Sequence, residues 1–109
     1  MEKFVKGDIV VIPFPFSDLS GSKKRPALVL ADLQGNDIIL CQITSQETKD
    51  EYAIAIKDSD FKTNILPVQS NIRPNRIFTA DKAIIIKKAA ALNETTLDRV
   101  IQKIISILS

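Results

Sequence analysis

The chain has 109 residues, of which 45% are hydrophobic and 26% are charged, with a formal net charge of +2. These values are ordinary for a globular protein, and the length predicts one domain over residues 1–109. Histidine is absent and Cys41 is the single cysteine, which excludes a Ser-His-Asp or Cys-His catalytic set and an internal disulfide, and argues against a zinc site.

The sequence also indicates where the protein works. Its first residues, MEKFVKGD, lack the apolar core of a signal peptide, and no apolar run is long enough to cross a membrane. Cys41 lies in an apolar run, as expected for a reduced thiol in the core. Nucleotide-binding motifs of the Walker or G-x-G-x-x-G type are missing. We therefore expect a cytoplasmic protein with no membrane association, metal or cofactor.

Two apolar runs near the N-terminus flank a basic loop. Ile9–Pro13 and Ala27–Ala31 are short and rich in Val, Ile and Leu, which predicts two buried strands. The loop between them ends in Lys23, Lys24 and Arg25, the densest positive charge in the chain. Cations on a loop held by two rigid strands suit contact with a polyanion. Pro26 restricts Arg25 to an extended backbone and so helps to aim its side chain.

Further short strands are predicted along the chain. They are expected over Ile38–Ile43, Tyr52–Ile56 and Ile65–Ile72. Pro67 predicts an edge position for the last of these, because proline has no N–H to donate. The segments 47–51 and 57–64 are polar and predict loops, and residues 73–76 (Arg-Pro-Asn-Arg) predict a turn.

The C-terminal segment is the clearest helix. Asn93 is a suitable N-cap, and Glu94 favours the first turn. An apolar stripe at helical spacing, typical of a core-facing helix, comprises Leu97, Val100, Ile101, Ile104, Ile105 and Leu108. Many short strands followed by one helix predict a mainly β (α+β) fold. We expect a strongly bent antiparallel sheet or small barrel with the helix over one open face.

Several residues allow a structural interpretation as well as a functional one. Arg25 could be a solvated cation or a salt-bridge partner, and the Thr44 hydroxyl could cap the backbone at a strand end. Lys23 and Lys24 suit a solvated face as well as phosphate steering.

Elsewhere the structural interpretation competes in the same way. Arg73 and Arg76 could simply flank a turn. Phe14 and Phe16 could stack on bases, but core packing is the better explanation in a chain with so few aromatic residues.

Three stretches carry a family resemblance. Residues 7–30, GDIVVIPFPFSDLSGSKKRPALVL, strongly resemble the opening of MazF/PemK-type toxins, the ribosome-independent RNA endonucleases of bacterial type II toxin–antitoxin pairs. Ile43-Thr44-Ser45 is similar to a strand end of that family, and residues 72–81, IRPNRIFTAD, to its late strand and turn. The terminal helix sits where the family has one, so the resemblance covers nearly the whole chain.

The resemblance implies a fold, an activity and partners. The fold would be a small SH3-like antiparallel barrel of the MazF/PemK/CcdB type with a C-terminal helix. The activity would be metal-independent cleavage of single-stranded RNA through its own 2′-hydroxyl, which leaves a cyclic phosphate and a free 5′-hydroxyl. The partners would be a second copy of the chain, and a cognate antitoxin whose acidic, disordered segment covers the basic face.

The resemblance also assigns residues. The family's arginine before proline matches Arg25, and its threonine after the third strand matches Thr44, so these two are the expected catalytic residues. The late-strand arginine of some members matches Arg73. The residues expected to contact RNA are Asp18, Ser20, Lys23, Lys24, Ser45, Gln46, Arg73 and Asn75.

The general base remains unassigned. Arginine stays protonated in proteins, so Arg25 is expected to stabilise charge on the phosphorus. Ser20 and Lys24 stand where some family members carry Glu and His, and Asn75 stands where some have aspartate. Asp18 is the nearest loop carboxylate. The competing function is a non-catalytic binder, which would be an SH3-like interaction module or a DNA-binding regulator. A toxin directed at gyrase is a further, weaker alternative.

Overall fold

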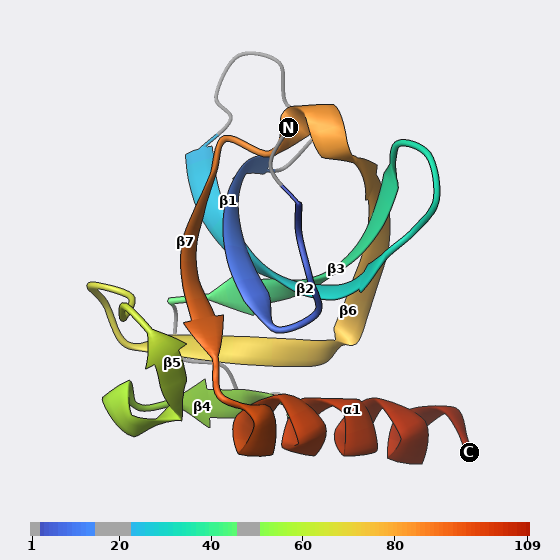
Figure 1. The fold of residues 1–109 in the computed structure, drawn as a ribbon. Coiled ribbons are helices and arrows are strands. Elements are labelled where there is room, and N and C mark those ends of the chain that lie inside the picture. The colour runs from blue at the N-terminus through green and yellow to red at the C-terminus, as the bar shows by residue number, and fades with distance from the viewer. Residues whose placement is uncertain (1–2, 15–22, 46–50) are drawn as a thin grey trace.

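The computed structural model describes residues 3–14, 23–45 and 51–109, which form seven strands and one α-helix (Figure 1). The elements are β1 (Asp8–Phe14), β2 (Lys23–Asp32), β3 (Asp37–Thr44), β4 (Ile54–Ile56), β5 (Phe61–Thr63), β6 (Ser70–Asp81), β7 (Lys87–Leu92) and α1 (Glu94–Leu108). Two short 3-10 helices, η1 (Asp58–Asp60) and η2 (Lys82–Ile84), precede β5 and β7.

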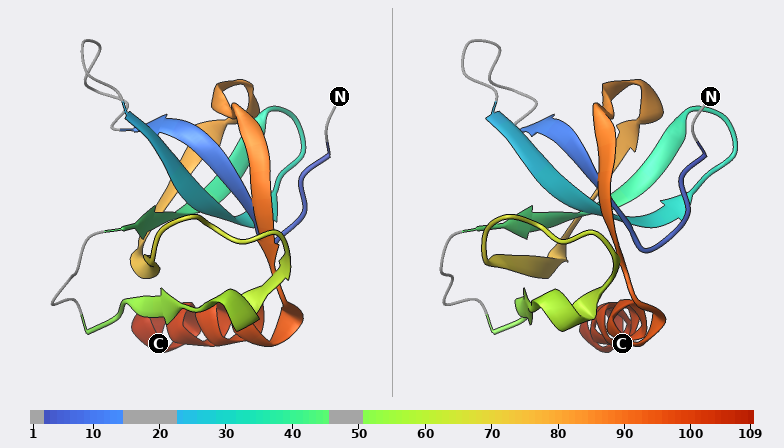
Figure 2. Two further views of the ribbon diagram at one scale, coloured as in Figure 1. Left: turned by 90° about the vertical axis from the view of Figure 1, so that its left-hand side faces the viewer. Right: turned by 60° about the vertical axis from the view of Figure 1, so that its left-hand side comes forward.

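The strands form one antiparallel sheet in the order β4-β6-β3-β2-β1-β7-β5. The sheet curls into a half-barrel, and α1 lies across its lower side next to β4 (Figures 1 and 2). The two edge strands, β4 and β5, are joined through η1. The mainly β fold with a covering C-terminal helix is therefore confirmed.

Apolar side chains form a core on each face of the curled sheet. The helix-side core joins Val100 of α1 to β-strand residues such as Leu28 and Ile72. The inner core, on the other face, contains Phe4, which precedes β1, together with Val29 and other strand residues. Burial on both faces explains why the first strands are continuous apolar runs and do not alternate.

One predicted strand is wrong in its position. The stretch expected as the edge strand Ile65–Ile72 is irregular over residues 64–69, and β6 begins only at Ser70. β6 then runs through the expected turn at residues 73–76 and lies between β3 and β4. Pro74 is tolerated in this interior strand because it lies in a bulge, where a ladder hydrogen bond is already missing.

Other element boundaries also differ from the expectation. β2 begins at Lys23, so the basic residues assigned to a loop are part of a strand. β4 is shorter than predicted, and the segment 57–64 contains η1 and β5. β7 was not predicted because Lys87 and Lys88 begin it. Such elements form because β1 and β7 offer them partners, which local sequence does not reveal.

The helix follows the prediction at its start and departs from it at its end. The Asn93 side chain accepts a hydrogen bond from the Thr96 backbone N–H at 2.8 Å, as expected of an N-cap. Val100 is fully buried, whereas Ile105 is 50% exposed and Leu108 is 78% exposed. The last turn of the predicted core stripe therefore lies outside the core.

Asp60 ties the β4–β5 connection to the start of α1. Its carboxylate accepts hydrogen bonds from the Lys57 backbone N–H at 2.7 Å and from the Thr96 hydroxyl at 2.8 Å. The Asn93 amide adds a bond to the Ser59 carbonyl at 3.0 Å. The Lys57 N–H is the main cause that lowers the pKa of Asp60 below its ordinary value, helped by Thr96.

This contact predicts a pH-dependent stability. A folded-state pKa below the ordinary 3.8 means that ionised Asp60 stabilises the fold above about pH 4, and that this contribution is lost as the pH falls through the folded-state value. We expect Asp60→Ala to lower the free energy of unfolding by about 1–3 kcal/mol at pH 7 and by less at pH 3, in urea titrations. Asp58→Ala, at an exposed neighbour in η1, is the control, and equal losses at both pH values would contradict the assignment.

Cys41 is a buried thiol in the helix-side core, as predicted. Its Sγ donates a hydrogen bond to the Arg73 carbonyl at 2.9 Å. Burial raises the pKa of this thiol to about 12.

We therefore expect Cys41 to resist thiol reagents while the protein is folded, since the thiolate is the reactive form. Labelling by a disulfide reagent at pH 8 should be slow in buffer and complete within minutes in concentrated urea. Fast labelling of the folded protein would show that the β3–β6 contact opens readily.

Candidate active site

The basic residues before Pro26 lie on the first part of β2, where pairing with β1 aims them. Lys23, Lys24 and Arg25 stand opposite Phe14, Pro13 and Ile12. Successive side chains of a strand point to opposite faces. Lys23 and Arg25 therefore share one face of the sheet and Lys24 faces the other. Arg25 is half-buried, whereas both lysines are exposed.

Arg25 and Thr44 lie at neighbouring strand ends and on the same face. The last pair recorded between β2 and β3 is Ala27–Gln42, and each of the two site residues lies two positions beyond it. By strand alternation both belong to the face of the inner core, which includes Ala27 and Leu40. Figure 2 shows the start of β2 and the end of β3 on the same side of the molecule, where the two strands separate.

Arg25 and Thr44 belong to a row of side chains that continues across the sheet through Asn71 and Ala55. We call these four residues the strand-end row. Thr44 stands opposite Asn71 of β6, and Asn71 stands opposite Ala55 of β4. Directly opposed residues in antiparallel strands lie on one face with Cα atoms about 4.5–5.5 Å apart. Asn71 was not among the residues expected at the site. The sequence indicates only that Asn71, next to the apolar Ile72 in an extended stretch, would face the opposite side of its strand.

A wide bulge in β6 carries two more of the expected residues. Residues 73–76 lie between the pairs Ile43–Ile72 and Cys41–Ile77, so four residues of β6 oppose the single β3 residue Gln42. The bulge is anchored from inside by Pro74, which is fully buried, and by the Cys41 hydrogen bond to Arg73.

The two expected residues differ in exposure. Arg73 is half-buried and follows Asn71 by two positions, whereas Asn75 is exposed on the bulge. Arg73 also makes a further interaction within the protein.

The remaining expected residues lie at or beyond the strand ends. Ser45 follows β3 directly and is exposed. Asp18, Ser20 and Gln46 lie outside the described residues, as does Phe16.

The described part of the row offers hydrogen-bond donors of a particular kind. Arg25 contributes a guanidinium, Thr44 a hydroxyl and Asn71 a carboxamide, and Arg73 adds a second guanidinium nearby. These groups suit a phosphate oxyanion, since guanidinium can donate two parallel hydrogen bonds to phosphate oxygens. Within residues 3–14, 23–45 and 51–109, no group of three or more His, Cys, Asp or Glu side chains is placed to hold a metal ion.

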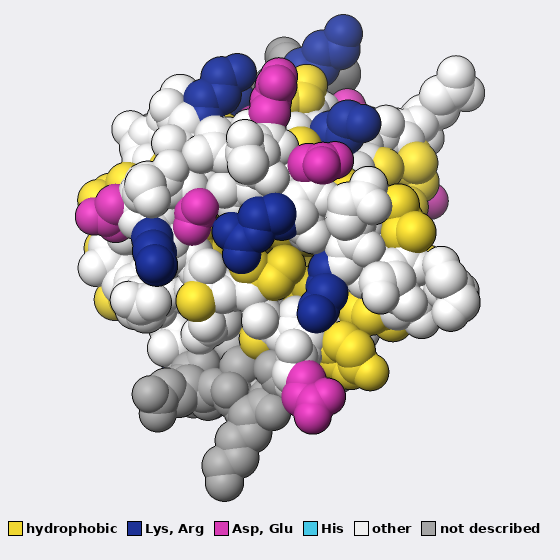
Figure 3. All heavy atoms as spheres, turned by 90° about the horizontal axis from the view of Figure 1, so that it is seen from below, with side chains coloured by type: hydrophobic (Ala, Val, Ile, Leu, Met, Phe, Trp, Pro, Cys, Tyr) yellow, Lys and Arg dark blue, Asp and Glu magenta, His cyan; other side chains and the backbone are white. Residues whose placement is uncertain are grey.

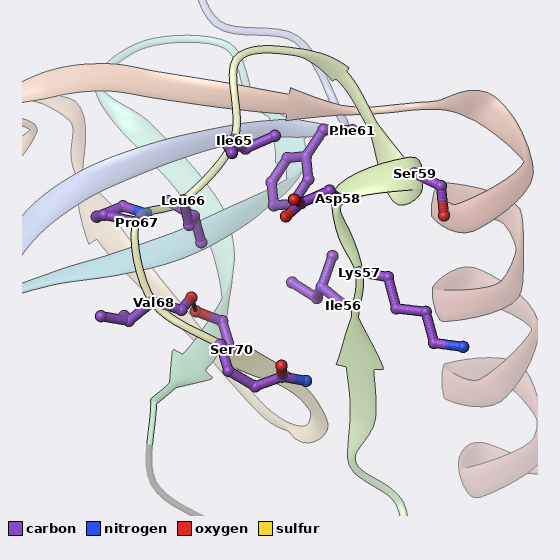
Figure 4. Close-up of a pocket in the computed structure, with 11 residues that line it drawn as sticks. Ile56, Lys57, Asp58, Ser59, Phe61, Ile65, Leu66, Pro67, Val68 and Ser70 are labelled. Atoms are coloured by element: carbon purple, nitrogen blue, oxygen red, sulfur yellow. Dashed lines mark hydrogen bonds between the residues drawn. The ribbon is translucent and has the colours of Figure 1, made fainter.

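A separate hollow of about 550 Å³ lies between the two sheet edges. Figure 4 shows Ile56, Phe61 and Leu66 pointing into it. Its rim includes the exposed side chains Ile65 and Val68. The residues that line it include none of the expected site residues, so we assign the candidate site to the strand-end row.

The helix side of the molecule has a different character. Figure 3 shows that face from below, with Lys and Arg side chains interspersed with Asp, Glu and apolar groups. On α1, the Lys103 Nζ lies 6.0 Å from the centre of the Tyr52 ring. Among the described helices, none has the length and apolar character needed to cross a membrane.

Comparison of the fold with solved structures finds close likeness at low identity. An endoribonuclease from a mycobacterial species, solved with its cognate antitoxin, superposes with a TM-score of 0.75 at 14% identity, covering 97% of this chain and 95% of that one. The MazE–MazF complex from Deinococcus radiodurans gives 0.74 at 21% identity, with 94% of both chains covered. The Mycobacterium tuberculosis toxin MazF-mt6 gives 0.72 at 12% identity, covering 93% and 95%.

Comparison by sequence gives the family. No curated protein matches the chain significantly. The family model described as the PemK-like, MazF-like toxin of type II toxin–antitoxin systems matches residues 5–108. That match includes Arg25, Thr44 and Asn71 as well as α1. The chain therefore belongs to the PemK/MazF-like family of type II toxins.

Proposed function

We propose that the protein is a metal-independent endoribonuclease that cuts single-stranded RNA through the RNA's own 2′-hydroxyl. The observation that carries this proposal is the pair Arg25 and Thr44, at neighbouring strand ends on one face, in a chain of a toxin family. RNA is the substrate because its 2′-oxygen is the nucleophile, so DNA of the same sequence should resist cleavage even if it binds. Such a substrate implies a cytoplasmic setting.

Each residue has a definite role in this proposal. Attack by the 2′-oxygen builds negative charge on the non-bridging oxygens of the phosphorus. Arg25 donates two hydrogen bonds to these oxygens, and the Thr44 hydroxyl donates one. Half-burial strengthens these interactions because water screens them less.

Other residues bind the remainder of the strand. Arg73 and Lys23 neutralise neighbouring phosphates, and Lys24, on the opposite face of the sheet, adds longer-range attraction for the strand. These contributions add affinity without sequence preference. Asn75, Ser45, Gln46, Ser20 and Asp18 complete the proposed RNA contacts. A base at the strand ends or in the segments beyond them takes the 2′-proton. A second proton, from an acid in the same region or from water, goes to the 5′-oxygen as its bond to phosphorus breaks.

Cleavage by purified protein tests the proposal. In EDTA, the wild type should cut a long RNA and leave cyclic-phosphate and 5′-hydroxyl ends. Arg25→Ala should slow cleavage by about a hundredfold or more, since one preorganised donor to developing charge is worth roughly 3 kcal/mol. Arg25→Lys should also be slow because a lysine cannot form the bidentate pair. Cleavage is followed by primer extension, which also reads the cut sites.

Arg99→Ala is the matched control, because it removes an exposed arginine from α1 and should leave the rate unchanged. If the wild type binds RNA without cutting it, and Arg25→Ala only weakens binding, the protein is a nucleic-acid binder. If neither form affects RNA and the wild type inhibits gyrase, the target is a protein.

We also propose a homodimer and an antitoxin with an acidic, disordered segment as the protein's partners. The mycobacterial and Deinococcus structures that resemble this chain contain an antitoxin. A basic strand-end row is complementary to an acidic segment, which gains charge-assisted hydrogen bonds and loses conformational entropy on binding.

Co-expression tests the antitoxin partner. The short acidic product of an adjoining gene should co-purify with the toxin and block RNA cleavage. Amide exchange should then be slowed at the start of β2 and the end of β3, and the complex should weaken as salt is raised. Binding that leaves both cleavage and these amides unchanged would assign the acidic partner to another face.

A further inference from the structure

Asn71 is the residue that the strand pairing adds to the row. It stands directly opposite Thr44 on one side and Ala55 on the other. Its neighbours in the chain, Ser70 and Ile72, are buried on the opposite face of β6. The Asn71 carboxamide is therefore held beside the Thr44 hydroxyl, on the face that carries Arg25.

The surroundings of Asn71 leave it room to meet a ligand. Asn71 and Thr44 are half-buried, whereas Ala55 is exposed and has only a methyl side chain. β4 is an edge strand, so among the described residues no further strand pairs with β4 beyond Ala55. Asn71 interacts with the rest of the protein, but a carboxamide has two N–H donors and an oxygen with two lone pairs. A carboxamide can therefore contact a ligand as well as a neighbouring protein group.

The chemistry of the row separates two tasks. Guanidinium groups and hydroxyls bind phosphate, which carries no sequence information. A base edge presents donors and acceptors together, and it is open to hydrogen bonding in single-stranded RNA. Asn71 is the neutral side chain directly opposite Thr44, and its carboxamide can donate and accept side by side, as asparagine does in base recognition.

We propose that Asn71 contacts the base next to the cleaved bond and sets the preference for that base. This inference rests on the proposed ribonuclease function. Asn71 lies one strand away from Thr44, so the nucleotide whose phosphate meets Thr44 presents its base, or that of its neighbour, to the carboxamide.

Sequencing of the cut ends from a long RNA of mixed composition tests the inference. Asn71→Asp keeps the shape of the side chain but replaces the two donors with an acceptor. We expect the base preference at one position beside the cut to fall or switch by about tenfold, within the 1–3 kcal/mol that one good base contact supplies. Asn71→Ser, which keeps a polar side chain of smaller reach, should relax the preference at the same position.

Asn36→Asp is the matched control, since it makes the same chemical change in the exposed turn before β3 and should leave the cut-site profile unchanged. Circular dichroism verifies folding of each variant, and Asn71→Ser decides the question if Asn71→Asp does not fold. Cut-site frequencies equal to wild type in a folded Asn71 variant, even with slower cleavage, would show that Asn71 only supports the sheet. A wild type that cuts no RNA would overturn the proposed function itself.

Discussion

The pairing of β3 with β2 on one side and β6 on the other is the constraint on which the rest of this structure depends. The bulge at residues 73–76 places an odd number of extra residues in β6. Side chains therefore change face at the bulge: Ile72 packs into the helix-side core, whereas Ala80 packs into the inner core. One strand thereby serves both cores, and the same register brings Asn71 beside Thr44.

The two faces of the sheet have different tasks. On the helix side, Val100 packs into the core while Asp60 and Asn93 tie α1 to the β4–β5 connection. These contacts hold the two sheet edges near one another without closing the barrel by strand pairing. The opposite face is left to carry polar groups where the strands end, which is where binding residues are commonly positioned by a rigid scaffold.

The row of donors explains how a chain without histidine could act on RNA. Phosphoryl chemistry gains most from groups that are already aimed at the charge as it develops. Arg25 is held by strand pairing to β1, and the backbone at Arg73 is held by the Cys41 thiol. The backbone at both arginines is therefore fixed before any ligand binds, which reduces the conformational freedom lost on binding.

The sequence by itself determined the local features of this protein: the apolar strands β1, β2 and β3, the Asn93 cap of α1, and the motif around Arg25 that indicates the toxin family. It could not determine that residues 73–76 form a bulge within β6, or that β5 and β7 are strands, because a partner strand distant in the chain decides each of these. For the same reason the sequence could not show that Lys24 lies on the opposite face from Arg25, or that Asn71 lies beside Thr44. A local pattern sets which residues extend or coil, but only the register between strands decides which side chains share a face, and a shift of one residue exchanges them all.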